Sequence, residues 1–96
     1  MSSIRWPIKD PQERLDYSLK WEKELTRVND TIFDSFWRIE DDDDTLLMDG
    51  HGVSGYIAYV WLTGGTHGTT YKLVNTINTN QGRIYERTVS LQVMHR

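Results

Sequence analysis

Four consecutive carboxylates, Asp41–Asp44, come closest in this chain to the composition of a metal site. A calcium loop of the EF-hand type alternates acidic residues with others, turns at a Gly and closes with a bidentate Glu. That order of residues does not follow Asp41. Because four adjacent negative charges repel one another, we expect an exposed loop tip and no calcium ion.

Two glycine-rich segments share only their composition with catalytic or phosphate-binding loops. Gly52–Gly55 reads Gly-Val-Ser-Gly, but the nucleophile elbow of hydrolases needs a further Gly where this chain has Tyr56. Gly64–Gly68 lacks the Lys-Ser/Thr pair with which a P-loop holds phosphates. Neither segment predicts a nucleophile or a nucleotide site.

The remaining titratable residues do not form a catalytic set either. His51, His67 and His95 have no helical or strand spacing that would bring two of them to one metal ion. The acidic residues outside the Asp41–Asp44 run fall at predicted outward positions of strands, so no buried pair of carboxylates is expected. We therefore predict no catalytic residue, no metal ion and no cofactor, and a protein that is not an enzyme.

Composition narrows the class of protein further. A chain of 96 residues accommodates one domain, and the absence of cysteine excludes disulfides, thiolate zinc sites and a cysteine nucleophile. No apolar run approaches the ~20 residues of a membrane-spanning helix and no signal-peptide core is recognised, so we expect a soluble protein. The net charge of −3 argues against nucleic-acid binding, which depends mainly on neutralising phosphates.

The charge is unevenly distributed along the chain. Residues 1–45 carry seven basic and twelve acidic residues, whereas residues 46–96 carry four and two. Two interpretations stay open: the acidic loop is simply solvated, or the polarity supports head-to-tail stacking of copies.

The elements that position these residues are predicted to be strands, and the clearest is a hairpin over residues 69–93. Two runs rich in β-branched and aromatic residues flank the turn Asn80-Gln81-Gly82. In the second run the residues expected to face the core share one parity: Tyr85, Val89, Leu91 and Val93. Side chains alternate between the two faces of a strand, so this run buries one face and exposes the other.

Further strands are predicted upstream of the hairpin, over Leu15–Glu22, Thr31–Glu40, Leu46–Met48 and Tyr56–Thr63, with a glycine-rich bend at Asp49–Gly55. Any helical tendency is limited to a single turn near Lys23 to Arg27. Six to seven short antiparallel strands separated by turns predict an all-β, immunoglobulin-like β-sandwich. We expect residues 15–96 to form this domain and residues 1–14 to form an extended N-terminal arm.

Tyr71 follows Gly68-Thr-Thr ahead of the long hairpin strand. This arrangement suits the corner of an immunoglobulin-like domain, where a Tyr hydroxyl bonds to nearby backbone. We expect Tyr71 to make such a bond.

Five apolar side chains are candidates for an interface with other proteins. Ile4, Trp6 and Ile8 alternate along an arm that both prolines of the chain keep out of a helix or an inner strand. The arm lies either along the edge of its own sandwich or on a neighbouring subunit. Tyr59 and Trp61 share the face of their strand that is expected to point away from the core, and are therefore available for contact.

Several short motifs occur in a fixed order: Lys9-Asp-Pro, Leu15-Asp-Tyr with Trp21, Asn29-Asp-Thr-Ile, Val60-Trp-Leu-Thr-Gly-Gly, Tyr71 with Asn75-Thr-Ile-Asn-Thr, Gly82-Arg, and a closing Val-x-Leu-x-Val. In this order and spacing the chain resembles, from about Lys9 to Val93, the small tailed-phage virion proteins known as fibre–tail adaptors. The resemblance implies an immunoglobulin-like sandwich without enzymatic activity, in which Lys9–Pro11, Trp61–Gly65 and Asn75–Thr79 are framework and turn positions. Asp41–Asp44 and Glu22–Arg27 depart from it as variable loop material.

The resemblance implies a structural virion protein of the tail or neck that docks fibre to tail through non-covalent contacts. Its partners would be other virion proteins, with several copies in a symmetric assembly and no nucleic acid or membrane, and it would be made in the host cytoplasm. Two alternatives stay open: a capsid decoration or cement protein, and a carbohydrate-binding module that stacks sugars on Tyr59 and Trp61.

Overall fold

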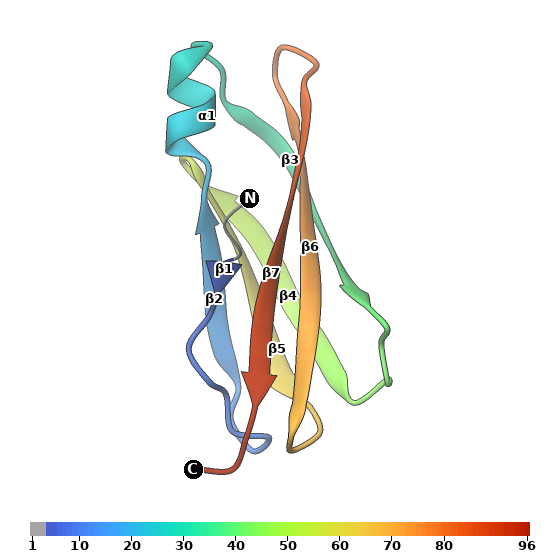
Figure 1. The fold of residues 1–96 in the computed structure, drawn as a ribbon. Coiled ribbons are helices and arrows are strands. Elements are labelled where there is room, and N and C mark those ends of the chain that lie inside the picture. The colour runs from blue at the N-terminus through green and yellow to red at the C-terminus, as the bar shows by residue number, and fades with distance from the viewer. Residues whose placement is uncertain (1–3) are drawn as a thin grey trace.

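The chain forms two β-sheets that pack face to face, as seen in the computed structural model, which describes residues 4–96 (Figure 1). The elements in the described residues are β1 Ile4–Arg5, β2 Leu15–Lys20, α1 Glu22–Arg27, β3 Ile32–Glu40, β4 Leu46–Ser54, β5 Ile57–Gly64, β6 Thr69–Thr79 and β7 Ile84–Val93. The prediction of an all-β sandwich is confirmed.

The strand order divides the elements between a larger and a smaller sheet. Over residues 4–96, four strands pair in the order β1-β7-β6-β3 and three in the order β2-β5-β4. Neighbouring strands are antiparallel except β1, which runs parallel to β7. If β1 to β7 are lettered A to G in chain order, the smaller sheet contains B, E and D and the larger sheet contains C, F and G. Immunoglobulin constant-type domains divide these strands in the same way, and here strand A lies beside G. The topology is consistent with the predicted immunoglobulin-like class.

The β6–β7 hairpin predicted from the sequence is present and long. Its register runs from Thr69 opposite Val93 to Asn78 opposite Ile84. Gly82 closes the turn with a φ of 89°, a conformation that glycine adopts without the steric cost of a side chain. The alternation along β7 buries the expected side chains against the smaller sheet: Val89, Leu91 and Val93 are at most 1% exposed.

A hydrogen-bonded polar group crosses the core between the sheets. Asn75 on β6 is fully buried, and its Oδ1 accepts a hydrogen bond from Nε1 of Trp21, which follows β2, over 2.9 Å. Its Nδ2 donates to Ser35 Oγ at 2.9 Å and to the carbonyl of Phe36 at 3.0 Å. Because a buried amide without partners is costly, these bonds fix how the two sheets sit on each other.

Tyr71 makes the predicted bond to nearby backbone. Its hydroxyl accepts a hydrogen bond from the N–H of Thr66 at 2.8 Å and donates to the carboxylate of Asp43 at 2.8 Å. Asp43 also accepts from the Thr45 hydroxyl at 2.6 Å. The Thr45 hydrogen bond is the largest of the effects that together lower the pKa of Asp43 to about 2. The acidic run is therefore a loop, as predicted, but one of its carboxylates fastens it to the sandwich.

The short helix α1 replaces the end of the predicted first strand. The strand ends at Lys20, and the carbonyl of Trp21 accepts a hydrogen bond from the N–H of Leu25 at 3.0 Å. Leu25 is fully buried, so the helix is anchored by one core contact. Acidic residues in the first turn and Arg27 in the last turn suit the helix dipole.

The predicted glycine-rich bend at Asp49–Gly55 is wrong. The chain continues as strand β4 through this segment to Ser54, with an irregular register between Met48 and His51. His51 is therefore an exposed strand residue rather than a turn residue.

Asp30 is a buried carboxylate, contrary to the prediction that acidic residues outside the acidic run face outward. Its Oδ2 lies 2.9 Å from Nη1 of Arg83, and its Oδ1 accepts from the N–H groups of Thr31 and Gln81 at 2.8 and 3.2 Å. Burial raises the pKa of Asp30, but hydrogen bonds, first from the Thr79 side chain, outweigh this and lower it. The group ties the segment after α1 to the β6–β7 turn.

Candidate protein interface

The N-terminal arm lies along β7 of its own sandwich. The N–H of Trp6 donates to the carbonyl of Ser90 at 2.9 Å, and the N–H of Lys9 donates to the carbonyl of Gln92 at 3.1 Å. The N–H of Met94 donates back to the carbonyl of Lys9 at 2.9 Å. Of the two arrangements that the sequence left open, the described part of the arm therefore takes the intramolecular one.

Trp6 is packed against aromatic residues of the same chain. Its ring stacks on Tyr17 with centroids 4.7 Å apart and lies 5.6 Å from the ring of Trp37. Its Nε1 donates to the carbonyl of Ser18 on β2 at 3.2 Å. The indole thus bridges the gap between β7 and β2 at the edge of the sandwich, and only part of it is left exposed.

Lys9 is a buried residue of the arm that the sequence analysis did not recognise as a core position. Its side chain is fully buried, and Nζ donates to the carbonyls of Asp10 at 2.9 Å and Gly64 at 2.7 Å. Burial lowers the pKa of Lys9, and the charges of Glu13 and Asp10 oppose the shift. The bond to Gly64 joins the arm to the end of β5, which agrees with the framework position that the family resemblance implied for Lys9.

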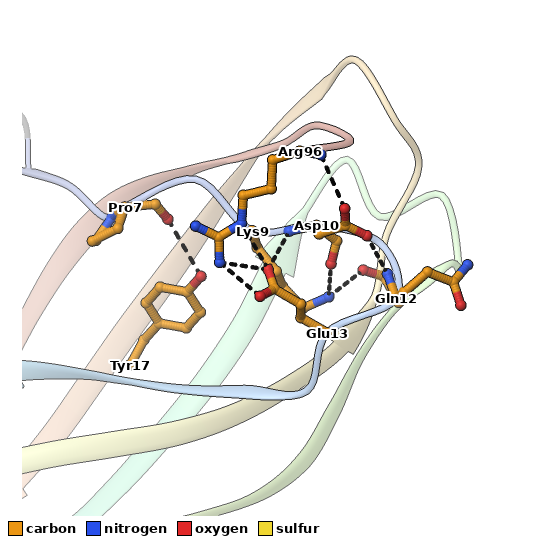
Figure 2. Close-up of polar contacts among 8 residues, drawn as sticks. Pro7, Lys9, Asp10, Gln12, Glu13, Tyr17 and Arg96 are labelled. Carbon is orange, nitrogen blue, oxygen red and sulfur yellow. Dashed lines mark hydrogen bonds and ion pairs between the residues drawn. The ribbon is translucent and has the colours of Figure 1, made fainter.

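An ionic cluster fastens the turn that follows the arm (Figure 2). The guanidinium of Arg96 contacts both carboxylate oxygens of Glu13 at 2.6 and 2.7 Å, and the N–H of Arg96 donates to Asp10 at 3.0 Å. Backbone hydrogen bonds, first from Gln12, lower the pKa of Asp10, and the N–H of Asp10 lowers that of Glu13 in the same way. Both carboxylates are therefore stabilised as anions while the arm is docked.

Tyr59 and Trp61 lie on the outer face of the smaller sheet, and their rings lie against the neighbouring strand β4. A Cβ built on Gly52 would fall 2.4 Å from the Tyr59 hydroxyl, and one on Gly50 would fall 3.8 Å from the Trp61 ring. The two rings therefore lie across the glycines of β4, which explains why these glycines are tolerated within a strand. The guanidinium of Arg14 sits 4.3 Å from the Trp61 ring centroid on the same face.

The structure brings the arm and the two rings onto one side of the molecule. A shallow cavity of about 360 Å³ is lined by the arm residues Trp6 and Ile8 and by Ser18 on β2. Ser18 pairs directly with Tyr59 on β5, so the cavity lies one strand away from Tyr59 and Trp61. Ile8 is 42% exposed beside this cavity. We refer to Trp6, Ile8, Tyr59 and Trp61 as the arm–ring surface.

Ile4 takes a different position from the other arm residues. It pairs with Val89 at the start of the arm and packs, half-buried, against the hydrophobic core. Ile4 therefore contributes to the edge of its own sheet more than to the arm–ring surface.

A second apolar region, which the sequence analysis did not single out, lies near the β6–β7 turn. Phe33, Phe36 and Ile84 are 69%, 49% and 72% exposed. Phe36 pairs with Thr76 and Ile84 with Asn78, so the last two side chains flank β6 on the outer face of the larger sheet. We call these three residues the hairpin-end patch. Phe36 precedes the buried Trp37 on β3, so the alternation of side chains along a strand is a signal that could have found it.

Residues 4–96 contain no group of three or more His, Cys, Asp or Glu side chains that could hold a metal ion. His67 and His95 stack with ring centroids 4.6 Å apart, but the contact is exposed at the end of the sandwich. No helix among the described residues is long and apolar enough to cross a membrane.

Comparison with known proteins identifies one family. The family model described as "Podophage GP4 fiber-tail adaptor protein gp77" matches residues 9–92, which include every element of the sandwich except β1 and the last residue of β7. No curated protein matches the chain.

Proposed function

Because the chain belongs to the podophage fibre–tail adaptor family, we propose that it joins fibre to tail as a structural subunit that docks by non-covalent contacts of its β-sandwich. The observation that carries this function is the family match over residues 9–92. The family is one of structural proteins of the phage tail, so the protein has a structural role in the virion.

The finer features of this role form the rest of the proposal. Its partners are tail and fibre proteins, it is present in several copies related by symmetry, it is made in the host cytoplasm, and it has no enzymatic activity. Symmetric arrangement is the common state of assemblies built from identical small subunits. The lack of a candidate metal cluster in residues 4–96 is in keeping with a binding role.

We place docking on four of the five residues that the sequence singled out, Trp6, Ile8, Tyr59 and Trp61, and not on Ile4, which packs against the core. The geometry that supports this choice is the continuity of the arm–ring surface across β2. Rigid aromatic side chains are the usual anchors of protein interfaces, since they bury a large area at a small cost in side-chain entropy. Trp6 and Trp61 are already held in place by contacts within the chain, which lowers that cost further.

The alternative functions have less support. The family match gives no support to a capsid cement protein or to a carbohydrate-binding module. Sugar stacking needs an open ring face, but the guanidinium of Arg14 lies over the ring of Trp61, 4.3 Å from its centroid.

Docking can be tested on tail particles that lack this protein. The purified chain is expected to co-sediment with them, and Ile8→Ser is expected to weaken binding because Ile8 is an exposed apolar residue of the arm–ring surface. Phe33→Ser is the matched control, since it makes a comparable change in the hairpin-end patch. If the wild-type chain does not bind tail particles that lack this protein, the adaptor role is contradicted. If Phe33→Ser loses binding and Ile8→Ser does not, the choice of the arm–ring surface as the docking site is contradicted, but the adaptor role is not.

A further inference from the structure

A groove of about 980 Å³ lies beside the edge formed by β1 and β7. One wall is the end of β2 and the helix α1, which contribute Lys20 and Lys23. The other wall is the outer side of β6 and β7, which contributes Lys72 and Thr88. The groove is therefore bordered by lysines on both sides.

The acidic residues of this groove are mostly neutralised within the chain. Glu24 pairs with Arg87 at 2.6 Å, and Glu86 pairs with Arg38 at 3.4 Å. The three lysines make no ion pair with any described residue, and Glu22 is the one acidic lining residue without such a pair in residues 4–96. The groove consequently presents a net positive charge to a binding partner.

The chain also carries a rigid segment of the opposite charge. In the Asp41–Asp44 loop all four aspartates are exposed, and Asp43 is held by hydrogen bonds from Tyr71 and Thr45. Oδ1 of Asp42 accepts a hydrogen bond from the N–H of Asp44 at 2.8 Å. The loop is therefore ordered before it meets a partner, which reduces the entropy lost on binding.

The loop and the groove lie on opposite edges of the larger sheet. Strands β3 and β1 form the two edges of this sheet (Figure 1). The loop follows β3, and the groove borders β7 and β1. Two complementary surfaces on opposite edges of one molecule form a contact between copies that is head-to-tail and closes into a ring or continues as a filament.

We propose that the Asp41–Asp44 loop of one copy docks into the lysine-bordered groove between α1 and β7 of the next copy. This inference rests on the proposed function, in which several copies stand side by side in the tail. Under this proposal, the excess of acidic residues in the first half of the chain contributes to the contact between copies and does not only keep the acidic loop solvated. Contacts between exposed charges are screened by salt, so the association weakens as ionic strength rises.

The test uses two variants that each remove one half of the contact. K20Q/K23Q removes two of the three lysine charges that border the groove, and D41N/D42N removes two of the four negative charges of the loop while keeping side chains that tolerate its backbone conformation. Sedimentation velocity at low ionic strength is expected to show self-association of the wild type. Each variant alone is expected to associate about tenfold more weakly, the effect of losing two exposed charge pairs. An equimolar mixture of the two variants is expected to form a heterodimer and nothing larger, because one intact loop meets one intact groove.

Two controls carry a single change in charge of the same sign outside the contact. Arg27→Gln lies on α1 one turn from Lys23 and does not border the groove, and Asp34→Asn lies on β3 before the loop. Both are expected to associate like the wild type. A wild type that stays monomeric at low ionic strength, or a mixture that stays monomeric, overturns the proposal. If the monomeric chain still docks on tail particles that lack this protein, the adaptor role stands and only the contact between copies is wrong. If, in addition, K20Q/K23Q is the one variant that loses docking, the groove receives an acidic segment of another virion protein.

Discussion

The N-terminal arm and the β6–β7 hairpin end both carry apolar side chains at the margin of the sandwich, yet they differ in what covers them. Trp6 stacks on Tyr17 and approaches Trp37, so the arm is built into the edge of its own domain. Phe33 and Ile84 at the hairpin end are 69% and 72% exposed.

The hairpin end is nevertheless well ordered. Asp30 pairs with Arg83, and the N–H of Asn80 donates to the carbonyl of Thr31 at 3.0 Å, so the turn is tied to the start of β3. An apolar side chain at the edge of the sandwich can therefore either stabilise the fold or remain exposed for contact with a partner. Which of these holds is decided by the neighbours that the tertiary structure supplies.

The largest effect is expected for Trp6→Ala. This variant removes the ring contacts with Tyr17 and Trp37, and we expect the free energy of unfolding in urea to fall by about 3 kcal/mol. Ile8→Ala, two residues along the arm and 42% exposed, is the control and should lose under about 1 kcal/mol. Equal losses in the two variants would show that the arm does not act as part of the core.

Lys9→Met should have the next largest effect. The apolar stem is kept, but the carbonyls of Asp10 and Gly64 lose the donor that reaches them, at a cost of about 2 kcal/mol. Lys72→Met removes the ammonium of an exposed lysine and should change the free energy of unfolding by less than about 0.5 kcal/mol. Thermal or urea unfolding measures the free energy of unfolding of both variants. A Lys9→Met variant as stable as the wild type would mean that water replaces the lysine as the donor to the two carbonyls.

Acid should loosen the arm, because Asp10 and Glu13 fasten it as anions through Arg96. The pKa values of Asp10 and Glu13 are lowered in the folded chain, so their stabilising effect is present above the ordinary values of 3.8 and 4.5 and is lost as the pH falls through the lower folded values. The NMR signal of the Trp6 indole N–H, which bonds to Ser18, reports this loss.

Glu13→Gln should make the Trp6 signal less dependent on pH in that range. Glu22→Gln, a change at an exposed residue of α1, provides the control and should titrate like the wild type. If the Trp6 signal depends on pH in the same way in the wild type and both variants, the Arg96 cluster does not stabilise the arm.

The smallest effect on stability is expected in the hairpin-end patch. Phe33→Ser and Ile84→Ser remove side chains that are mostly exposed, so the free energy of unfolding should change by no more than about 0.5 kcal/mol each. Urea denaturation beside Trp6→Ala gives the direct comparison. A loss near that of Trp6→Ala would show that the patch is covered within the chain.

Local alternation predicted much of the fold. The hairpin over residues 69–93 and the outward rings of Tyr59 and Trp61 follow from parity within single strands, which depends on neighbouring residues alone. The sandwich followed from the number and spacing of such strands.

Buried polar residues could not be predicted in the same way. Asp43 meets Tyr71, Lys9 meets Gly64 and Asp30 meets Arg83, and each pair is far apart along the chain. A pattern of polar and apolar residues places every Lys and Asp outward, because the partner that makes burial tolerable is invisible locally.

The candidate interface shows a related limit. Parity indicates that a ring lies on an outer face, but it gives no information on what lies across that ring. Only the tertiary structure reveals that Gly50 and Arg14 flank Trp61.

The parallel pairing of the arm with β7 has a mechanical consequence. A pull on the start of the arm against the far end of β7 loads the bonds at Trp6, Lys9 and Met94 in shear, so they share the force and yield together. A pull that peeled the arm sideways would instead break them one at a time. A tether attached at the start of the arm would thus be held most strongly when tension runs along the sheet.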